Sequence, residues 1–170
     1  PAAVLDIGSS KVVCLCGSMA DGDGIVVHGA GVCTYEGYRD GAFIDKQSLH
    51  NAVVEALQKA EQESRIRIRD VALTVPGPFS DLLLTDATLS FGRPRKTEAA
   101  DIDRLIALSL EKCKKKPGYT LMHSTPVFFL VDGVSSTEVP EGITTDEISA
   151  LISHMFVQEA YIRTVQESLD

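Results

Sequence analysis

The chain has 170 residues, 44% of them hydrophobic and 24% charged, with a formal net charge of −8 at pH 7. This composition allows one substantial core or two small ones and excludes an intrinsically disordered chain. The negative charge opposes non-specific binding to nucleic acid, so we expect no nucleic-acid partner.

Three apolar runs open the chain and predict strands at 2–7, 11–17 and 24–35. Gly8-Ser9-Ser10 separates the first two runs, and Asp21-Gly22-Asp23-Gly24 separates the second from the third. Because both connections are short and contain glycine, the pattern predicts an antiparallel meander of hairpins.

A long amphipathic helix is predicted at 46–64, with Asp45 as its N-cap. Its predicted buried stripe consists of Leu49, Val53, Leu57 and Ala60. The run at 70–77 then predicts a buried strand that proline and glycine terminate. The first half of the chain therefore has the order β-β-β-α-β.

The second half predicts a β-α-β-β block followed by a helix. Thr97 is the expected N-cap of the first helix, and Pro126 favours a bend or an edge position in the second strand. The expected elements are a strand at 82–91, a helix to about residue 113, a strand at 119–133, a further long run at 146–156 and a helix at 157–169.

The four cysteines do not have the spacing of a metal site. Cys14 and Cys16 lie two apart in a predicted strand and therefore share a face. We interpret all four as reduced cysteines that act as small buried hydrophobic side chains.

The ends of the sequence are abrupt. No initiator methionine precedes Pro1, and the chain stops directly after the helix predicted at 157–169. We therefore expect the sequence to be a piece of a longer protein.

The turn between the first two predicted strands combines groups that bind phosphate. Gly8 lets the backbone approach a ligand, Ser9 and Ser10 supply hydroxyl donors, and Lys11 supplies positive charge. Asp6 fits this set if a Mg²⁺ ion lies between it and the phosphate, held through water. The loop is not a Walker A sequence, and an ordinary hairpin turn is the alternative interpretation.

The stretch LDIGSSKVVCLCG resembles the first phosphate motif of the actin-like ATPases. More narrowly, the whole chain resembles the N-terminal part of the FtsA family, whose usual opening is D-I-G-[TS]-[SA]-K, and Asp6 to Lys11 match it at every position. Gly37 and Gly41 match the glycines of a family loop. The segment LMHSTPVFFLVDG resembles a later family pattern, although its leucine lies one residue further from the histidine than is typical.

The resemblance implies an α/β fold with a mixed sheet: an actin-like, ribonuclease-H-like β-β-β-α-β half-domain with an inserted β-α-β-β subdomain. The implied division is residues 1–78 for the first part of the actin-like subdomain, 79–153 for the insert and 154–170 for the truncated return to the actin-like subdomain.

The resemblance also implies binding of ATP with Mg²⁺. Gly8, Ser9, Ser10 and Lys11 would bind the phosphates, and Asp6 would reach Mg²⁺ through water. The family's second phosphate motif is absent, so no catalytic residue is assigned here. We expect at most a weak ATPase at full length, and weak or undetectable ATP binding without hydrolysis in this piece.

The implied partners belong to cell division. The family assembles into filaments with itself and tethers FtsZ, here through a region that this chain lacks, and the insert at 79–153 would contact later division proteins. A C-terminal amphipathic helix, also lacking, would attach the protein to the membrane. The implied location is cytoplasmic, on the inner face of the cell membrane at the division site.

Two alternatives stay open: a pilus-assembly protein similar to PilM, and a metabolic kinase of the same superfamily. The second lacks support because no convergent catalytic acid is visible after the first meander. We interpret His123 and His154 as satisfied or edge histidines, and we expect one of Phe128 and Phe129 to be buried.

Overall fold

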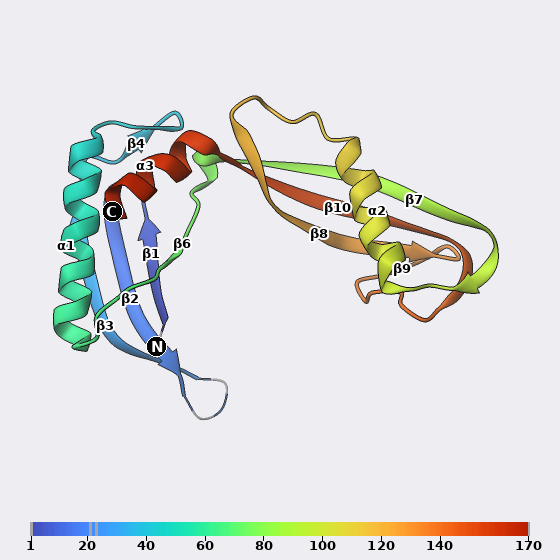
Figure 1. The fold of residues 1–170 in the computed structure, drawn as a ribbon, viewed down its shortest axis with the longest axis horizontal. Helices are drawn as coiled ribbons and strands as arrows, with labels where there is room; N and C mark the ends of the chain where they lie inside the picture. Colours follow the sequence, from blue (N-terminus) through green and yellow to red (C-terminus); the bar gives the residue numbers. More distant parts are fainter. Residues whose placement is uncertain (1, 21, 23, 170) are drawn as a thin grey trace. The chain divides into compact units, whose positions relative to one another are not determined.

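The chain folds into two compact units in a computed structural model that describes residues 2–20, 22 and 24–169. Unit 1 comprises Pro1–Ser80 and Gln158–Asp170, and unit 2 comprises Asp81–Val157. Unit 2 is therefore inserted into the sequence of unit 1 (Figure 1). The family resemblance predicts limits at residues 79 and 153 for this insert.

Unit 1 contains a four-stranded sheet in the order β3-β2-β1-β6. Strand β1 is antiparallel to β2 and parallel to β6, and β2 is antiparallel to β3, which confirms the predicted meander. The turn predicted at 21–24 includes residues 21 and 23, which lie outside the described residues. The strands are β1 (Ala2–Ile7), β2 (Lys11–Met19), β3 (Ile25–Thr34) and β6 (Ala72–Leu73).

The buried strand predicted at 70–77 is wrong in both length and burial. Only Ala72–Leu73 forms a strand, and Ala72 is exposed. The reason is position, because among the described residues β6 lies at the edge of the sheet and pairs only with Val4 and Leu5 of β1.

Helix α1 (Lys46–Ser64) has the predicted bounds and begins at the predicted N-cap. The Asp45 carboxylate accepts a hydrogen bond of 2.8 Å from the backbone N–H of Gln47. The predicted buried stripe is wrong at Leu57, which is only partly buried, whereas Ala52 and Ala56 are buried. Alanine lines this face because α1 lies close to the backbone of β3.

Aromatic side chains join the last helix of the chain to the rest of unit 1. This helix is α3 (Glu159–Leu169), two residues shorter than predicted because β10 continues through residue 158. Tyr161 stacks on Phe43 and packs on Phe79, with ring centroids 5.9 and 4.6 Å apart. Phe43 comes from β5 (Ala42–Phe43), which pairs with β4 (Tyr38–Arg39). Phe79 comes from the 3-10 helix η1 (Gly77–Phe79).

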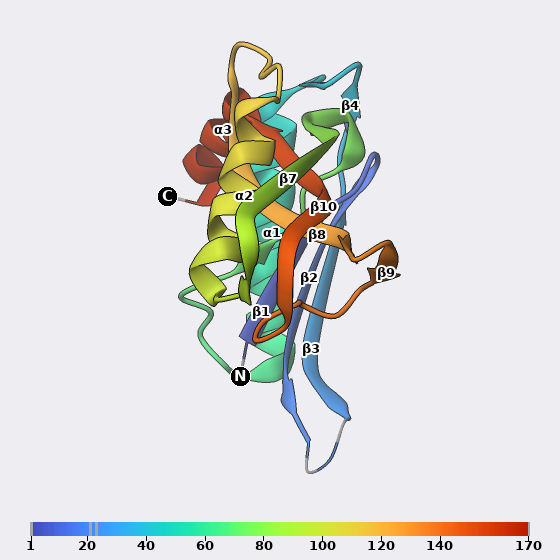
Figure 2. The ribbon, with the colours of Figure 1, turned by 90° about the vertical axis from the view of Figure 1, so that its right-hand side faces the viewer.

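Unit 2 contains a second four-stranded sheet, in the order β7-β10-β8-β9, with helix α2 on one face (Figure 2). Its core joins α2 to the three long strands, and Phe129 is buried in it whereas Phe128 is exposed, as predicted for one of the pair. The elements are β7 (Ser80–Lys96), α2 (Ala99–Glu111), β8 (Tyr119–Val131), β9 (Val134–Ser136) and β10 (Thr144–Gln158).

The predicted N-cap of α2 is wrong by one residue. Glu98 is the N-cap, and it forms a capping box with Asp101. Thr97 is buried, and its hydroxyl is hydrogen-bonded to the carbonyl oxygens of Pro140 and Ile143 instead. Its partners lie more than 40 residues away in the sequence, so local pattern could not identify them.

The two histidines of β8 and β10 have different surroundings. His123 is exposed, whereas His154 is fully buried with both ring nitrogens hydrogen-bonded at 2.8 Å, one to Ser109 Oγ and the other to Ser124 Oγ. The prediction of a satisfied histidine is confirmed for His154. Burial lowers the pKa of His154 below its ordinary value, so the ring is neutral at pH 7.

Candidate phosphate-binding loop

The candidate site is the tight turn between β1 and β2. The backbone N–H of Gly8 donates to the carbonyl oxygen of Lys11 at 2.9 Å, which closes the turn. Ser9, Ser10 and Lys11 are all exposed. A Cβ on Gly8 would lie only 3.1 Å from the Lys11 oxygen, so glycine fits this position best.

The segment that follows β3 fixes the back of this turn. The Tyr35 hydroxyl donates to the Gly8 carbonyl oxygen at 2.7 Å, and the Tyr35 N–H donates to the Ser10 carbonyl oxygen at 3.1 Å. Burial raises the pKa of Tyr35, so its hydroxyl keeps the proton that it donates.

Gly37 lies against the same turn. It has a positive φ of 84°, and a Cβ there would lie 1.9 Å from the Ser9 carbonyl oxygen. No other residue type fits both the conformation and the space. The carbonyl groups of the turn are thus held from behind, while Ser9, Ser10 and Lys11 face solvent.

Asp6 is oriented by a residue from the neighbouring strand. The Thr74 hydroxyl donates to Asp6 Oδ1 at 2.6 Å and accepts a long hydrogen bond of 3.4 Å from the Ile7 N–H. The Thr74 N–H donates to the Leu5 carbonyl oxygen at 3.1 Å, which continues the parallel pairing of β1 and β6. Asp6 itself is exposed, so its carboxylate is accessible from solvent.

Thr74 is held on its other side by α3. The Tyr161 hydroxyl donates to the Thr74 carbonyl oxygen at 2.7 Å. Burial is the main cause that raises the pKa of Tyr161, so this hydroxyl also stays protonated. A chain of hydrogen bonds therefore runs from Tyr161 through Thr74 to Asp6.

This donor set fits a magnesium-bound phosphate. Mg²⁺ in nucleotide sites takes one or two carboxylates together with phosphate oxygens and water, and the turn supplies one carboxylate, two hydroxyls and one ammonium group. Within the described residues no group of three or more His, Cys, Asp or Glu side chains could hold a metal ion directly. Asp6 would therefore contact the ion through water, with the phosphate and water as the direct ligands.

The cysteines stay outside this site. All four are free, and Cys14 and Cys16 are buried on one face of β2 as predicted. The predicted burial is wrong for Cys33 and Cys113, which are only partly buried. Burial, with smaller contributions from Cys16 and Glu61, raises the pKa of the Cys14 thiol to about 11. Such a thiol is a poor nucleophile at pH 7.

The turn could be predicted from the sequence, whereas Tyr35 and Thr74, which hold the turn and Asp6, could not. Tyr35 and Thr74 contact the turn or Asp6 across 27 and 68 positions of sequence. The available signal for Thr74 was its place within the strand predicted at 70–77. A parallel neighbour of β1 brings its next residue beside Asp6.

Curated relatives of this chain are bacterial proteins named "Cell division protein FtsA". The relative from Neisseria meningitidis serogroup B is 23% identical over 168 residues, which cover 99% of this chain and 40% of the relative. The relative from Streptococcus pneumoniae serotype 2 is 26% identical over 140 residues, which cover 82% of this chain and 30% of the relative. The chain is FtsA-like. A relative from Pseudomonas aeruginosa is 23% identical, and the match covers 35% of its length. This FtsA-like chain therefore spans about a third of the length of these relatives.

Comparison with solved structures supports the same fold. The chain superposes on a chain of a "PilM-PilN type IV pilus biogenesis complex" with a TM-score of 0.61 and 16% sequence identity, covering 99% of this chain and 43% of that one. At this identity the likeness shows the fold alone, which is the actin-like α/β fold with a mixed sheet. No family model matches the sequence.

Proposed function

We propose that this FtsA-like chain is the phosphate-binding N-terminal part of a cell-division protein that binds ATP with Mg²⁺. The observation that carries the proposal is the turn at Gly8–Lys11, whose carbonyl side is held by Tyr35 and Gly37 while its polar side chains face solvent. An ordinary hairpin turn needs no such support from behind.

Each group of the turn has a distinct role in this proposal. The hydroxyls of Ser9 and Ser10 donate hydrogen bonds to phosphate oxygens, and Lys11 balances their charge. Asp6 holds a water molecule of the Mg²⁺ shell, with Thr74 fixing the orientation of its carboxylate. Bound Mg²⁺ would neutralise charge on the phosphates. The chain supplies only one wall of a nucleotide site, so by itself it binds ATP weakly and does not hydrolyse it.

The proposal extends to assembly. As in the FtsA resemblance, the full protein would form filaments with itself and tether FtsZ through a region outside this chain. Unit 2 would contribute to self-assembly and recruit later division proteins. None of the helices in the described part of the chain has the length and apolar character needed to cross a membrane. We place the protein in the cytoplasm, attached peripherally to the inner face of the membrane through a helix outside this chain.

Titration of the full protein with Mg-ATP tests the nucleotide site. We expect Lys11→Ala to weaken binding about tenfold or more, because it removes the single cation of the turn. Lys114→Ala, which removes a lysine of unit 2, is the matched control and should bind like the unchanged protein. Equal affinity of the Lys11→Ala variant would contradict the assignment of the turn.

A role in pilus assembly is the second candidate, favoured by the superposition on the PilM–PilN complex over 99% of this chain. Co-sedimentation separates the two candidates. A cell-division protein should sediment with polymerised FtsZ, whereas a PilM-like protein should instead bind its PilN counterpart.

A further inference from the structure

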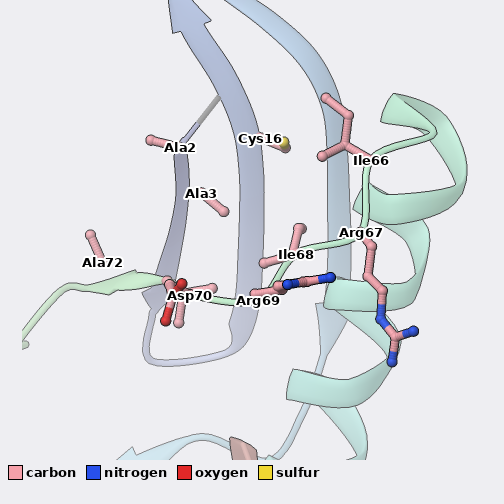
Figure 3. Close-up of a pocket in the computed structure, with 10 residues that line it drawn as sticks. Ala2, Ala3, Cys16, Ile66, Arg67, Ile68, Arg69, Asp70 and Ala72 are labelled. Atoms are coloured by element: carbon pink, nitrogen blue, oxygen red, sulfur yellow. The ribbon is translucent and has the colours of Figure 1, made fainter.

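Unit 1 has a cavity where β1 begins. It has a volume of about 530 Å³, and the segment between α1 and β6 closes one side of it (Figure 3). Its floor is apolar and includes Ala3, Cys16, Ile66 and Ile68. The cavity shares no residue with the turn at Gly8–Lys11.

Two arginines form a positive rim on this cavity. Arg67 and Arg69 are exposed and line it, and among the described residues neither forms an ion pair. Asp70 also lines the cavity, but in Figure 3 its carboxylate lies at the β6 end of the segment, whereas the two guanidinium groups extend toward α1. In a chain with a net charge of −8, this rim is a local exception.

The nearby acids of α1 form hydrogen bonds with backbone amides, and among the described residues they form no ion pair with the rim. Glu61 Oε1 accepts a hydrogen bond of 2.7 Å from the backbone N–H of Ile68, and Glu63 Oε2 accepts one of 2.8 Å from the backbone N–H of Ala30. Both carboxylates are therefore engaged by backbone amides. The guanidinium groups remain available for carboxylates from another molecule.

The distance between Arg67 and Arg69 matches an extended peptide as the partner. Along 66–69 half-buried isoleucines alternate with exposed arginines, as in an extended chain. Arginines two apart in such a chain lie about 7 Å apart, which is also the spacing of alternate side chains on one face of an extended peptide. Beside the cavity, β6 pairs only with Val4 and Leu5, so in the described residues no strand pairs with Ala2 and Ala3 on that side.

We infer that this cavity binds an extended acidic segment of a partner protein. Carboxylates on one face of the partner's peptide form ion pairs with Arg67 and Arg69. Apolar side chains on the other face of that peptide cover the floor of the cavity. The backbone of the segment is placed to pair with the free side of β1 at Ala2 and Ala3. The partner is a protein because a strand edge recognises peptide backbone, which a lipid headgroup does not offer.

Fluorescence polarisation on the full protein tests this inference with a fluorescein-labelled peptide of five Glu-Val repeats. We expect saturable binding that weakens as salt rises, and a loss of about tenfold or more in the Arg67→Glu/Arg69→Glu variant. The control is Arg93→Glu/Lys96→Glu, which makes the same change in charge at two exposed sites in unit 2. A peptide of five Gln-Val repeats should not bind.

Three results would overturn the inference. One is that the Glu-Val peptide does not bind, and another is that the double arginine variant binds it as well as the unchanged protein. The third is that phosphatidylglycerol vesicles bind through Arg67 and Arg69 while the peptide does not, which would make the rim a membrane contact. Circular dichroism of the double variant checks that it is folded, and Arg67→Lys/Arg69→Lys should retain part of the binding if the variant with glutamates unfolds.

Discussion

The two units each pack a helix on a four-stranded sheet, but by different contacts. In unit 1, α1 meets the backbone of β3 at glycines. A Cβ on Gly31 would lie 1.8 Å from the Ala56 carbonyl oxygen, and one on Gly29 would lie 2.5 Å from the Ser64 nitrogen. In unit 2, α2 packs through side chains, with Ile102 and Leu105 on a cluster that consists of Ala87, Leu89, Phe129, Ile148, Ala150 and Ile152.

The two interfaces also differ in polarity. Between α1 and its sheet the buried side chains are apolar, whereas unit 2 buries His154 between Ser109 and Ser124. Unit 1 should therefore respond most to added volume and unit 2 to pH.

The largest effect should come from Gly31→Ala, which tests backbone contact in unit 1. The added methyl group would overlap the Ala56 carbonyl oxygen, so we expect a loss of at least about 3 kcal/mol in the free energy of unfolding. Urea denaturation measures it. The control is Gly77→Ala, where a Cβ meets nothing within 4 Å, and it should change stability by less than about 1 kcal/mol. If the Gly31→Ala protein were as stable as the control, close backbone contact between α1 and β3 would not distinguish unit 1 from unit 2.

His154→Leu tests the polar core of unit 2. It leaves Ser109 and Ser124 without their ring partner, so we expect a loss of about 1–3 kcal/mol at pH 7. The adjacent His123→Leu, at an exposed position of β8, is the control and should be nearly neutral.

The pH dependence of the unchanged protein sharpens the same contrast. The pKa of His154 is lower in the folded than in the unfolded chain because of burial, so the unfolded state binds more protons as the solution is acidified. Stability of unit 2 should therefore fall as pH drops below about 6.5, the ordinary histidine value. Denaturation of the His154→Leu variant between pH 7 and 5 should show a smaller fall, and an equal fall would contradict this assignment.

Thr74→Val tests whether the hydrogen bonds of the Thr74 hydroxyl contribute to the stability of unit 1 and to Mg-ATP binding. The hydroxyl joins Asp6 Oδ1 and the Ile7 N–H, so its removal should cost about 1 kcal/mol and weaken Mg-ATP binding in the full protein. Thr74→Ser keeps the hydroxyl and should restore both properties. Normal Mg-ATP binding by Thr74→Val would show that Asp6 needs no orientation.

The smallest effect should come from the surface pairs of unit 2. Lys116 lies 3.1 Å from Asp81, but 59% of its side chain is exposed. Lys116→Ala should change stability by less than about 0.5 kcal/mol, as measured by urea denaturation. A larger loss would mean that surface charge contributes to unit 2 beside its core.

Local patterns predicted much of this fold. The bounds of α1 followed from Asp45 and an apolar stripe, and the hairpin at Gly8-Ser9-Ser10 followed from short polar spacing between apolar runs. The pattern could not predict that α1 would contact β3 through Ala56 rather than Leu57, because that depends on glycines of another strand.

The errors have the same origin in distant contacts. Thr97 has the composition of an N-cap, but the carbonyl groups of Pro140 and Ile143 engage its hydroxyl. At the candidate site the turn was visible in the sequence, whereas Thr74 became part of it only through the parallel pairing of β1 and β6.

The most direct test of the proposed function is a crystal structure of the full protein with Mg²⁺ and a non-hydrolysable ATP analogue. We predict phosphate oxygens within hydrogen-bond distance of Ser9, Ser10 and Lys11, and a Mg²⁺ ion that Asp6 reaches through water. A nucleotide bound elsewhere, with the turn making no phosphate contact, would contradict the assignment and leave the turn as an ordinary hairpin.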